Sequence, residues 1–218
     1  MIRYFTAGES HGPGLSGIVE GVPAGLEITE NEIAEHLARR QEGYGRGGRM
    51  AFEKDRAINS SGVRFGKTIG GPIALYMENR AFQKDKDGWP VVMNKETEAD
   101  GIEKITLPRP GHADLVGAQK YRFDDIRPVI ERSSARETGM RVACTGIARK
   151  FLKHFGIEIG GHVLRIGEAG YEAWEDIRTI ADPLIEQGGE HVYKTSDKSE
   201  VRCLDASLTE QMIDEIKK

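Results

Sequence analysis

The sequence has few cysteines, no long apolar run and no excess of positive charge. Its 218 residues include two cysteines, Cys144 and Cys203, which do not form a metal-ligand cluster. Cys144 falls inside a predicted helix and is typical of a small core residue, so a reduced cytoplasmic compartment is a simpler interpretation than a disulfide. No apolar run is long enough to cross a bilayer, and the first residues lack a secretory pattern. We therefore expect a soluble, cytoplasmic protein.

The charge balance and the glycine pattern disfavour further classes. The formal net charge of −4 gives no global attraction to nucleic acid or acidic membranes, and we expect neither as a partner. No Gly-x-Gly-x-x-Gly turn follows a predicted strand, because Gly43, Gly45, Gly47 and Gly48 have the wrong spacing and follow a helix, so a Rossmann fold is disfavoured. Glycine is nonetheless abundant, with 27 residues against an average of about 7%. This excess predicts tight turns and close backbone approaches.

The apolar periodicity predicts an alternating α/β order along the chain. Thr29 and Glu32 form a capping box at the start of a helix over about 30–41. A long helix is predicted to begin near residue 134 and to stop at Gly156. Its apolar face consists of Met140, Cys144, Ile147, Phe151 and Phe155. Strands are predicted over 2–7, 14–22, 57–60, 61–65, 73–77 and 157–166, a long exposed loop over 79–104, and a last helix capped by Ser207 and Glu210.

The start of the long helix is a candidate anion site. Ser134 is suited to the N-cap position, and Glu137 lies three residues on, where a capping box needs it. Hydroxyls, free backbone N–H groups and the side chains of Arg132 and Arg136 would then face one point, which favours an anionic ligand. The alternative is an ordinary capped helix with solvated arginines.

Two histidines lie in glycine-flanked turns. His11 stands in the segment 8–12, and His112 stands in the segment 109–114. Glycine allows the backbone to approach a ligand closely, and an imidazole with a reference pKa of about 6.5 can give or take a proton at working pH. A single loop histidine is more often a surface residue, but two in such turns favour a catalytic role.

Basic residues cluster over residues 39–64, with glycines between them at positions 43, 45, 47 and 48. The basic residues are Arg39, Arg40, Arg46, Arg49, Lys54, Arg56 and Arg64. A solvated loop and a nucleic-acid contact are two alternatives, although only Tyr44 and Phe52 are available for base stacking. A pocket for a small polyanion fits best, because arginine pairs bidentately with carboxylate and phosphate, and because further arginines accompany the other segments.

These four segments resemble the signatures of chorismate synthase. The matching stretches are 8–12 with 18–23, 39–50, 109–114 and 132–143, in the order and spacing of that family. The resemblance implies an α/β layered sandwich of helices and antiparallel sheets, one domain over residues 1–218, and a homotetramer. Thr145 stands where the family has glycine or alanine. The family's last signature is not found, so we expect an N-terminal portion of the enzyme, truncated at its C-terminus.

The resemblance also implies an activity, which is a phosphate lyase of the shikimate pathway in aromatic amino acid biosynthesis. Its substrate would be 5-enolpyruvylshikimate 3-phosphate, its products chorismate and phosphate, and its cofactor reduced FMN, with NADP(H) in forms that reduce their own flavin. The implied catalytic residues are His11 and His112. The implied cofactor-binding residues are Arg132, Ser133, Ser134, Arg40 and Arg46, and the implied substrate-binding residues are Arg40, Arg46, Arg49, Arg109 and Arg136. The alternative is a catalytically inactive, truncated form that binds anions or nucleotides.

Overall fold

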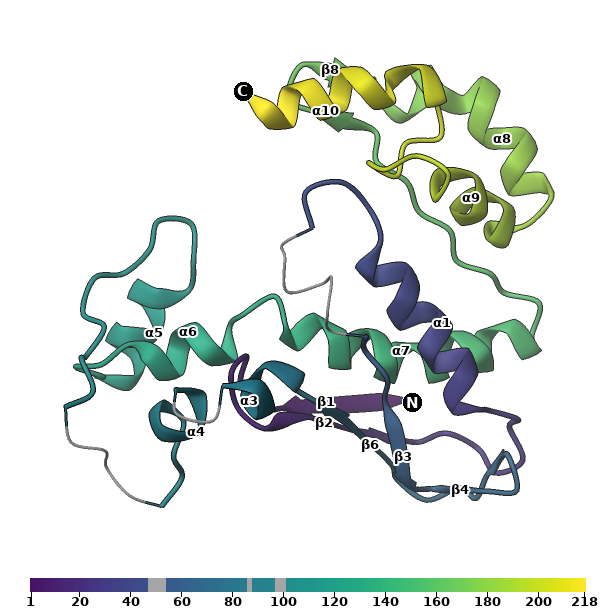
Figure 1. Cartoon of the computed structure of the whole chain (residues 1–218). Coiled ribbons are helices and arrows are strands. Elements are labelled where there is room, and N and C mark those ends of the chain that lie inside the picture. Colours follow the sequence, from purple (N-terminus) through teal and green to yellow (C-terminus); the bar gives the residue numbers. More distant parts are fainter. Residues whose placement is uncertain (47–53, 86–87, 97–100) are drawn as a thin grey trace. The chain divides into compact units, whose positions relative to one another are not determined.

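The computed structural model describes residues 1–46, 54–85, 88–96 and 101–218. The chain divides into two compact units (Figure 1). Unit 1 comprises Met1–Arg40 and Ala51–Ala148, and unit 2 comprises Gln41–Met50 and Arg149–Lys218. The organisation of residues 1–218 as one domain stays a prediction.

Unit 1 is built on a four-stranded antiparallel sheet in the order β1-β2-β6-β3. Its strands are β1 (Arg3–Ala7), β2 (Gly14–Glu20), β3 (Ile58–Ser61) and β6 (Ile73–Glu78), and β4 (Val63–Arg64) pairs with β5 (Lys67–Thr68) in a separate hairpin. The strands predicted from residue 2 to 77 are confirmed, with shifts of one or two residues at their ends. They are recognisable from sequence because alternating residues such as Leu15 and Val19 are buried while Ser16 and Ile18 are exposed.

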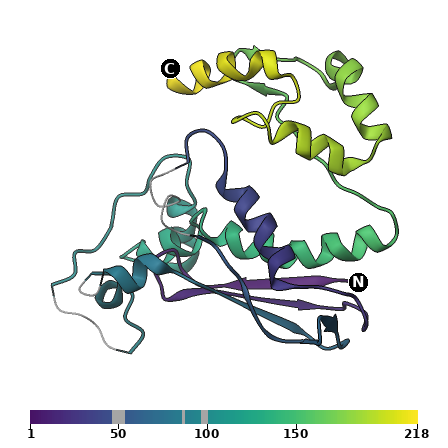
Figure 2. The same cartoon turned by 45° about the vertical axis from the view of Figure 1, so that its right-hand side comes forward.

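Two helices cover one face of this sheet. Helices α1 (Glu30–Gln41) and α7 (Glu137–His154) lie on the same side of the strands in both views (Figures 1 and 2). The predicted capping box of α1 forms, because the Thr29 N–H donates to Glu32 Oε2 at 2.9 Å and the Glu32 N–H donates to Thr29 Oγ1 at 3.3 Å. The other face of the sheet carries exposed apolar side chains from Phe5, Ile18 and Ile58.

Helix α7 packs directly against strand β2. Its predicted apolar face is buried at Met140, Cys144 and Ile147, whereas Phe155, at the far end, is 61% exposed. A Cβ added to Gly17 of β2 would lie 2.5 Å from the Cys144 sulfur, so glycine is what permits this close approach. After α7, Gly156 has φ 70° and stops the helix as predicted.

Among the described residues of unit 1, four further helices were not expected from the sequence. They are α3 (Arg80–Lys84), α4 (Trp89–Val92), α5 (Asp114–Tyr121) and α6 (Arg127–Arg132). The predicted loop over 79–104 is therefore wrong in part, because α3 and α4 lie within it. Both are a single turn long, too short to produce a readable apolar period.

Unit 2 consists mostly of short helices. The elements are β7 (Arg165–Ile166), β8 (Ala169–Gly170), η1 (Trp174–Ile177), α8 (Arg178–Glu186), α9 (Gly189–Ser196), η2 (Ala206–Leu208) and α10 (Thr209–Lys217). The predicted strand over 157–166 is wrong for most of its length: Arg165–Ile166 form β7 and Val163 makes an isolated bridge to Cys203, whereas residues 157–161 are exposed and pair with no strand among the described residues. The last helix is confirmed as α10, but the predicted Ser207 cap is wrong: the N-cap of α10 is Leu208, without a side-chain cap, and Asp205 caps the preceding η2 by accepting from the Ser207 N–H.

Among the described residues, no helix combines the length and apolarity needed to cross a bilayer. Both cysteines are free and buried. Burial raises the pKa of the Cys144 thiol to about 11, and the charge of Glu137 adds to the rise, so this thiol is a core residue as predicted.

Candidate active site

The first histidine segment is the loop between β1 and β2. Gly8 enters this loop with φ 109°, and a Cβ there would lie 2.4 Å from the Gly14 carbonyl oxygen. Asn79, at the end of β6, is fully buried and donates from Nδ2 to the carbonyls of Glu9 at 3.0 Å and Gly12 at 2.8 Å. One amide therefore clamps both sides of the loop that carries His11.

Within that loop, His11 is held by a buried carboxylate. The Glu131 carboxylate of α6 accepts from the His11 backbone N–H at 2.8 Å, and its Oε2 lies 3.0 Å from His11 Nδ1. Trp89 of α4 stacks on the imidazole, with ring centroids 3.7 Å apart and planes 17° apart. Burial opposes the charge of Glu131, but its hydrogen bonds with His11 and the charge of Arg127 hold the pKa of this carboxyl below its usual value.

The second histidine segment is held by hydrogen bonds to Asp114, the first residue of α5. Asp114 is fully buried and accepts from the Arg109 backbone N–H at 3.0 Å and from Arg109 Nε at 2.8 Å. The His112 Nδ1 also contacts Asp114 Oδ1. The Arg109 guanidinium, followed by the Arg109 N–H and the His112 ring, holds the pKa of Asp114 well below its ordinary value even though burial opposes this.

The two histidine segments are brought into one neighbourhood by α5 and α6. A Cβ on Gly117 of α5 would lie 2.3 Å from Val129 Cγ1 of α6, so the helices touch there. The electrostatic coupling agrees: the hydrogen bond to Asp114 chiefly raises the pKa of Arg109, and the charge of Glu131 contributes to the same rise. His11 and His112 thus stand on segments that are joined through the packing of α5 against α6.

The third segment differs from its prediction. Helix α7 begins at Glu137, and residues 133–136 form a turn after α6. Ser134 Oγ accepts from the Arg136 N–H, while the N–H groups of Glu137 and Thr138 donate to the carbonyls of Ser134 and Ala135. The predicted capping box is therefore wrong. The expectation of free N–H groups is wrong as well, because nearby oxygens already accept hydrogen bonds from these amides.

The Glu137 side chain has long-range partners instead. Thr6 of β1 donates its hydroxyl to Glu137 Oε1 at 2.6 Å, and Arg141 contacts the same carboxylate. Arg132 Nη2 donates to the Thr6 carbonyl at 2.8 Å and its side chain stays 42% exposed. Burial alone would raise the pKa of Glu137. The hydrogen bonds from Thr6 and Arg141 and the charges of Arg141 and Arg132 outweigh it, so the pKa lies below its usual value. Glu137 thus ties the start of α7 to β1, while Ser133, at the end of α6, is exposed.

Two of the predicted anion-binding arginines meet at Asp55. Arg136 is 7% exposed; its Nη1 pairs with Asp55 Oδ1, and its Nε donates to Asn79 Oδ1 at 2.8 Å. Arg40 reaches the same carboxylate at 3.4 Å and donates to Thr138 Oγ1 at 3.1 Å. The structure therefore connects Arg40, Asp55, Arg136 and Asn79 to the His11 loop.

The remaining predicted anion-binding arginines are Arg46, Arg49 and Arg109. Arg46 belongs to unit 2, where its Nε donates to the Glu42 carbonyl at 2.9 Å, and Arg49 lies outside the described residues. Arg109 is part of the His112 turn, with 51% of its side chain exposed.

Sequence reasoning missed the buried acids and the amide that organise the site. Asp55, Asn79 and Glu131 are all at most 7% exposed. Asp55 gave one usable signal, an acid flanked by Lys54 and Arg56 in a basic run. Asn79 and Glu131 gave none, because burial of a polar side chain is decided by distant parts of the chain.

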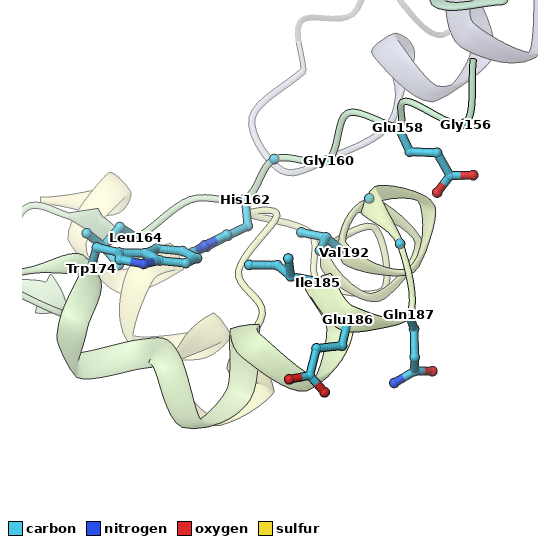
Figure 3. A pocket seen from close by; sticks show the side chains of 13 residues that line it. Gly156, Glu158, Gly160, His162, Leu164, Trp174, Ile185, Glu186, Gln187 and Val192 are labelled. Carbon is cyan, nitrogen blue, oxygen red and sulfur yellow. The ribbon is translucent and has the colours of Figure 1, made fainter. Parts of the chain in front are cut away.

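A cavity in unit 2 contains none of the candidate residues (Figure 3). Its volume is about 840 Å³, and its walls include Glu158, His162, Trp174, Ile185 and Val192. The His162 and Trp174 rings lie beside each other, with centroids 5.6 Å apart. The candidate site is therefore assigned by the polar clusters of unit 1 rather than by this cavity.

Comparison with known proteins gives a consistent result. A family model described as chorismate synthase matches residues 2–218. The chorismate synthase of Salinibacter ruber is 53% identical over 219 residues, covering 99% of this chain and 54% of that protein. That of Pelodictyon phaeoclathratiforme is 58% identical over 205 residues, covering 94% of this chain and 50% of that protein.

A crystal structure of chorismate synthase is similar to this chain, with a TM-score of 0.73 and 37% identity. The match covers 99% of this chain and 53% of that one. It confirms the predicted fold class, an α/β layering of helices and antiparallel sheets. The chain spans about half the length of the curated relatives it matches.

Proposed function

The chain belongs to the chorismate synthase family, and from this premise we propose that it is a phosphate lyase of the shikimate pathway. The substrate is 5-enolpyruvylshikimate 3-phosphate, and the products are chorismate and phosphate. One observation supports this proposal above all: three of the four family-like segments are linked by hydrogen bonds through Asn79, Arg136 and Arg40. A shared network of this kind is what a single reaction centre requires.

The substrate's charges suit this lining. It carries two carboxylates and a phosphate, and arginine is the side chain best matched to such groups. Arg40, Arg46, Arg49, Arg109 and Arg136 are proposed to hold these anions. Because Arg136 is buried and bound to Asp55 and Asn79, its contribution would be a fixed positive field and a fixed loop position rather than a mobile clamp.

Proton transfer is assigned to the histidines. The elimination breaks the carbon–oxygen bond to phosphate and removes a proton from C6, with no net redox change. The leaving phosphate oxygen needs a proton or a positive charge. His11 is proposed to supply that proton, and His112, beside Arg109 and Asp114, is proposed to place positive charge near the cofactor.

The residues present fit reduced FMN in charge and exposure. Ser133 is exposed, and the side chain of Arg132, its neighbour in sequence, is 42% exposed, so a hydroxyl and a cation are available to an anionic cofactor. Reduced FMN, when bound, supplies the electron density that assists loss of phosphate. We assign its binding to Arg132, Ser133 and Ser134, and contacts to NADP(H) to Arg40 and Arg46. The proposal extends to a cytoplasmic homotetramer.

The test is an anaerobic assay of the 218-residue chain with reduced FMN and substrate. Chorismate absorbance and released phosphate are measured together, and both should rise in equal amounts. Tight flavin or phosphate binding without turnover would favour the second candidate, an inactive anion- or nucleotide-binding module, which is kept because the chain spans about half of its relatives' length. If the chain shows neither binding nor turnover, both candidate functions are refuted.

A further inference from the structure

Glu131 contacts His11 at two separate points. Its Oε2 accepts the His11 backbone N–H at 2.8 Å, and both carboxylate oxygens lie within 3.0 to 3.1 Å of Nδ1. An ionised carboxylate can only accept hydrogen bonds. The contact is therefore favourable only when Nδ1 carries the hydrogen, and this fixes the tautomer of the ring.

The opposite ring nitrogen is the one left for chemistry. Among the described residues, none hydrogen-bonds His11 Nε2, and 28% of the side chain is exposed. Trp89 covers one face of the ring at 3.7 Å, so the imidazole plane is fixed by stacking as well as by Glu131. With hydrogen on Nδ1, a protonated ring presents Nε2–H outward, and a neutral ring presents the Nε2 lone pair.

We propose that Glu131 is a positioning residue for His11, holding Nδ1–H so that Nε2 is the atom that exchanges the proton. A buried carboxylate that orients a histidine from the far side of the ring is a general device in both metal sites and acyl-transfer sites. The inference rests on the proposed function only in naming the leaving phosphate as the group that receives the proton.

The proton balance leaves Glu131 unchanged. The Nε2–H bond of the imidazolium breaks, a phosphate O–H bond forms, and the electron pair of the broken carbon–oxygen bond leaves with phosphate. The ring becomes neutral while Nδ1–H stays on Glu131. Besides His11, the charges of Arg127 and Arg109 act on this carboxylate, and both favour its ionised form.

The surroundings of Glu131 indicate a role beyond simple packing. Its side chain is 3% exposed, and burying a carboxylate is costly unless it is paired and hydrogen-bonded. Its backbone carbonyl also accepts from the Ser10 N–H at 3.1 Å. That backbone bond survives substitution of the side chain, so the loop retains one tie to α6 when the carboxylate is removed.

The first experiment needs no enzymatic activity, and a variant serves only to assign the signals. The whole chain is labelled with ¹⁵N at histidine, and the ring-nitrogen shifts of His11 are followed by NMR as pH is raised until the ring is neutral. His11→Gln assigns the signals. We expect a neutral ring with hydrogen on Nδ1 and an unprotonated Nε2. A neutral ring with hydrogen on Nε2 and a bare Nδ1 would overturn the proposal.

The second experiment compares Glu131→Gln, Glu131→Asp and Glu20→Gln. Glu20 is the matched control, because it is a surface acid of the same unit that pairs with Arg3 at 3.8 Å. In Glu131→Gln we expect kcat to fall by at least about tenfold and by no more than the roughly 10²–10⁴-fold that general acid–base catalysis supplies, with KM little changed. Glu131→Asp keeps the charge and should recover part of the loss, and Glu20→Gln should match the wild type.

The outcomes separate this inference from the proposed function. Wild-type kcat in a folded Glu131→Gln variant, or equal losses in the Gln and Asp variants, would overturn the positioning role. If the wild-type chain shows no lyase turnover, the proposed function fails, and the ring-nitrogen measurement decides the positioning role without it. Circular dichroism melts confirm that each variant compared is folded.

Discussion

Asn79 joins Arg136 to the loop that carries His11. Its Oδ1 accepts from Arg136 Nε at 2.8 Å, while its Nδ2 donates to the carbonyls of Glu9 and Gly12 on either side of the loop. Arg136 in turn pairs with Asp55, which Arg40 shares. Buried polar networks of this kind rigidify a site only while every member is present.

The first prediction tests this junction. In Asn79→Ala, the two loop carbonyls and Arg136 Nε lose a buried partner, and we expect the free energy of unfolding to fall by about 1–3 kcal/mol. Urea denaturation measures the loss. The control is Asn31→Ala, because Asn31 is exposed and accepts a surface bond from Arg56 at 2.6 Å, whose loss should cost about 0.5 kcal/mol or less. Equal losses in both variants would show that the buried amide is dispensable.

The second prediction concerns the histidines. In His11→Ala and His112→Ala, we expect turnover to fall by roughly 10²–10⁴-fold while substrate affinity is largely kept, because each ring acts by proton transfer or charge. Steady-state kinetics with reduced FMN gives kcat and KM separately. His154→Ala is the control, since His154 is exposed at the end of α7. Near-full turnover in either site variant would remove that histidine from the mechanism.

Elements that depend on hydrogen bonds between neighbouring residues were predicted from the sequence, and elements that depend on distant partners were not. The start of α1 was predicted because Thr29 and Glu32 bond to each other within one turn. The same pattern at Ser134 and Glu137 failed, because Glu137 bonds to Thr6, 131 positions away in sequence. A capping pattern shows only that two neighbouring side chains could bond to each other. Partners from distant parts of the chain can bond to the same side chains instead.

The residues of the candidate site divide in the same way: some have a local sequence signal and others do not. Both histidines were singled out as candidates because glycines flank them, and the arginines because they cluster with glycines or with the predicted start of the long helix. Glu131 was not, because a glutamate between Ile130 and Arg132 in a short helix looks like a solvated surface residue. Its burial follows from the packing of the His11 loop against α6, and no local pattern encodes that contact. Trp89 was assigned to a loop for the same reason.

A third prediction follows from Asp114. Arg109 above all, with His112, holds its pKa well below the ordinary 3.8. Because the folded pKa is the lower one, the unfolded state binds more protons in acid, and the free energy of unfolding rises with pH in that range. The stabilisation is complete above the ordinary pKa and is lost as pH falls through the folded one.

Asp114→Asn should therefore flatten the acid limb of the stability curve. We expect the wild type to lose stability more steeply than this variant between about pH 5 and pH 2, as measured by urea denaturation at each pH. Asp214→Asn is the control, because the Asp214 side chain is 72% exposed, and its curve should follow the wild type. Parallel curves for the wild type and Asp114→Asn would mean that another carboxylate governs acid unfolding.

The last prediction tests the contact between strand β2 and helix α7, which supports the candidate site. A Cβ on Gly17 would lie 2.5 Å from Cys144 Sγ and 2.7 Å from Met140 Sδ. Replacing glycine by alanine restricts the unfolded chain and, at a compatible position, stabilises by about 0.4–1 kcal/mol. Overpacking a core costs about 1–3 kcal/mol, so the clash should outweigh the gain and Gly17→Ala should be destabilising.

Gly71→Ala is the matched change, because a Cβ there meets nothing within 4 Å; only the gain remains, and the variant should equal or exceed the wild type in stability. Thermal melts of the two variants should therefore move in opposite directions. Met140 can shift its flexible thioether, but Cys144 has a short side chain on the same helix, so relief requires α7 to move away from β2. If Gly17→Ala proved as stable as Gly71→Ala, the close approach of β2 and α7 would not be a constraint on the fold, and the position of the turn at 133–136 would need another support.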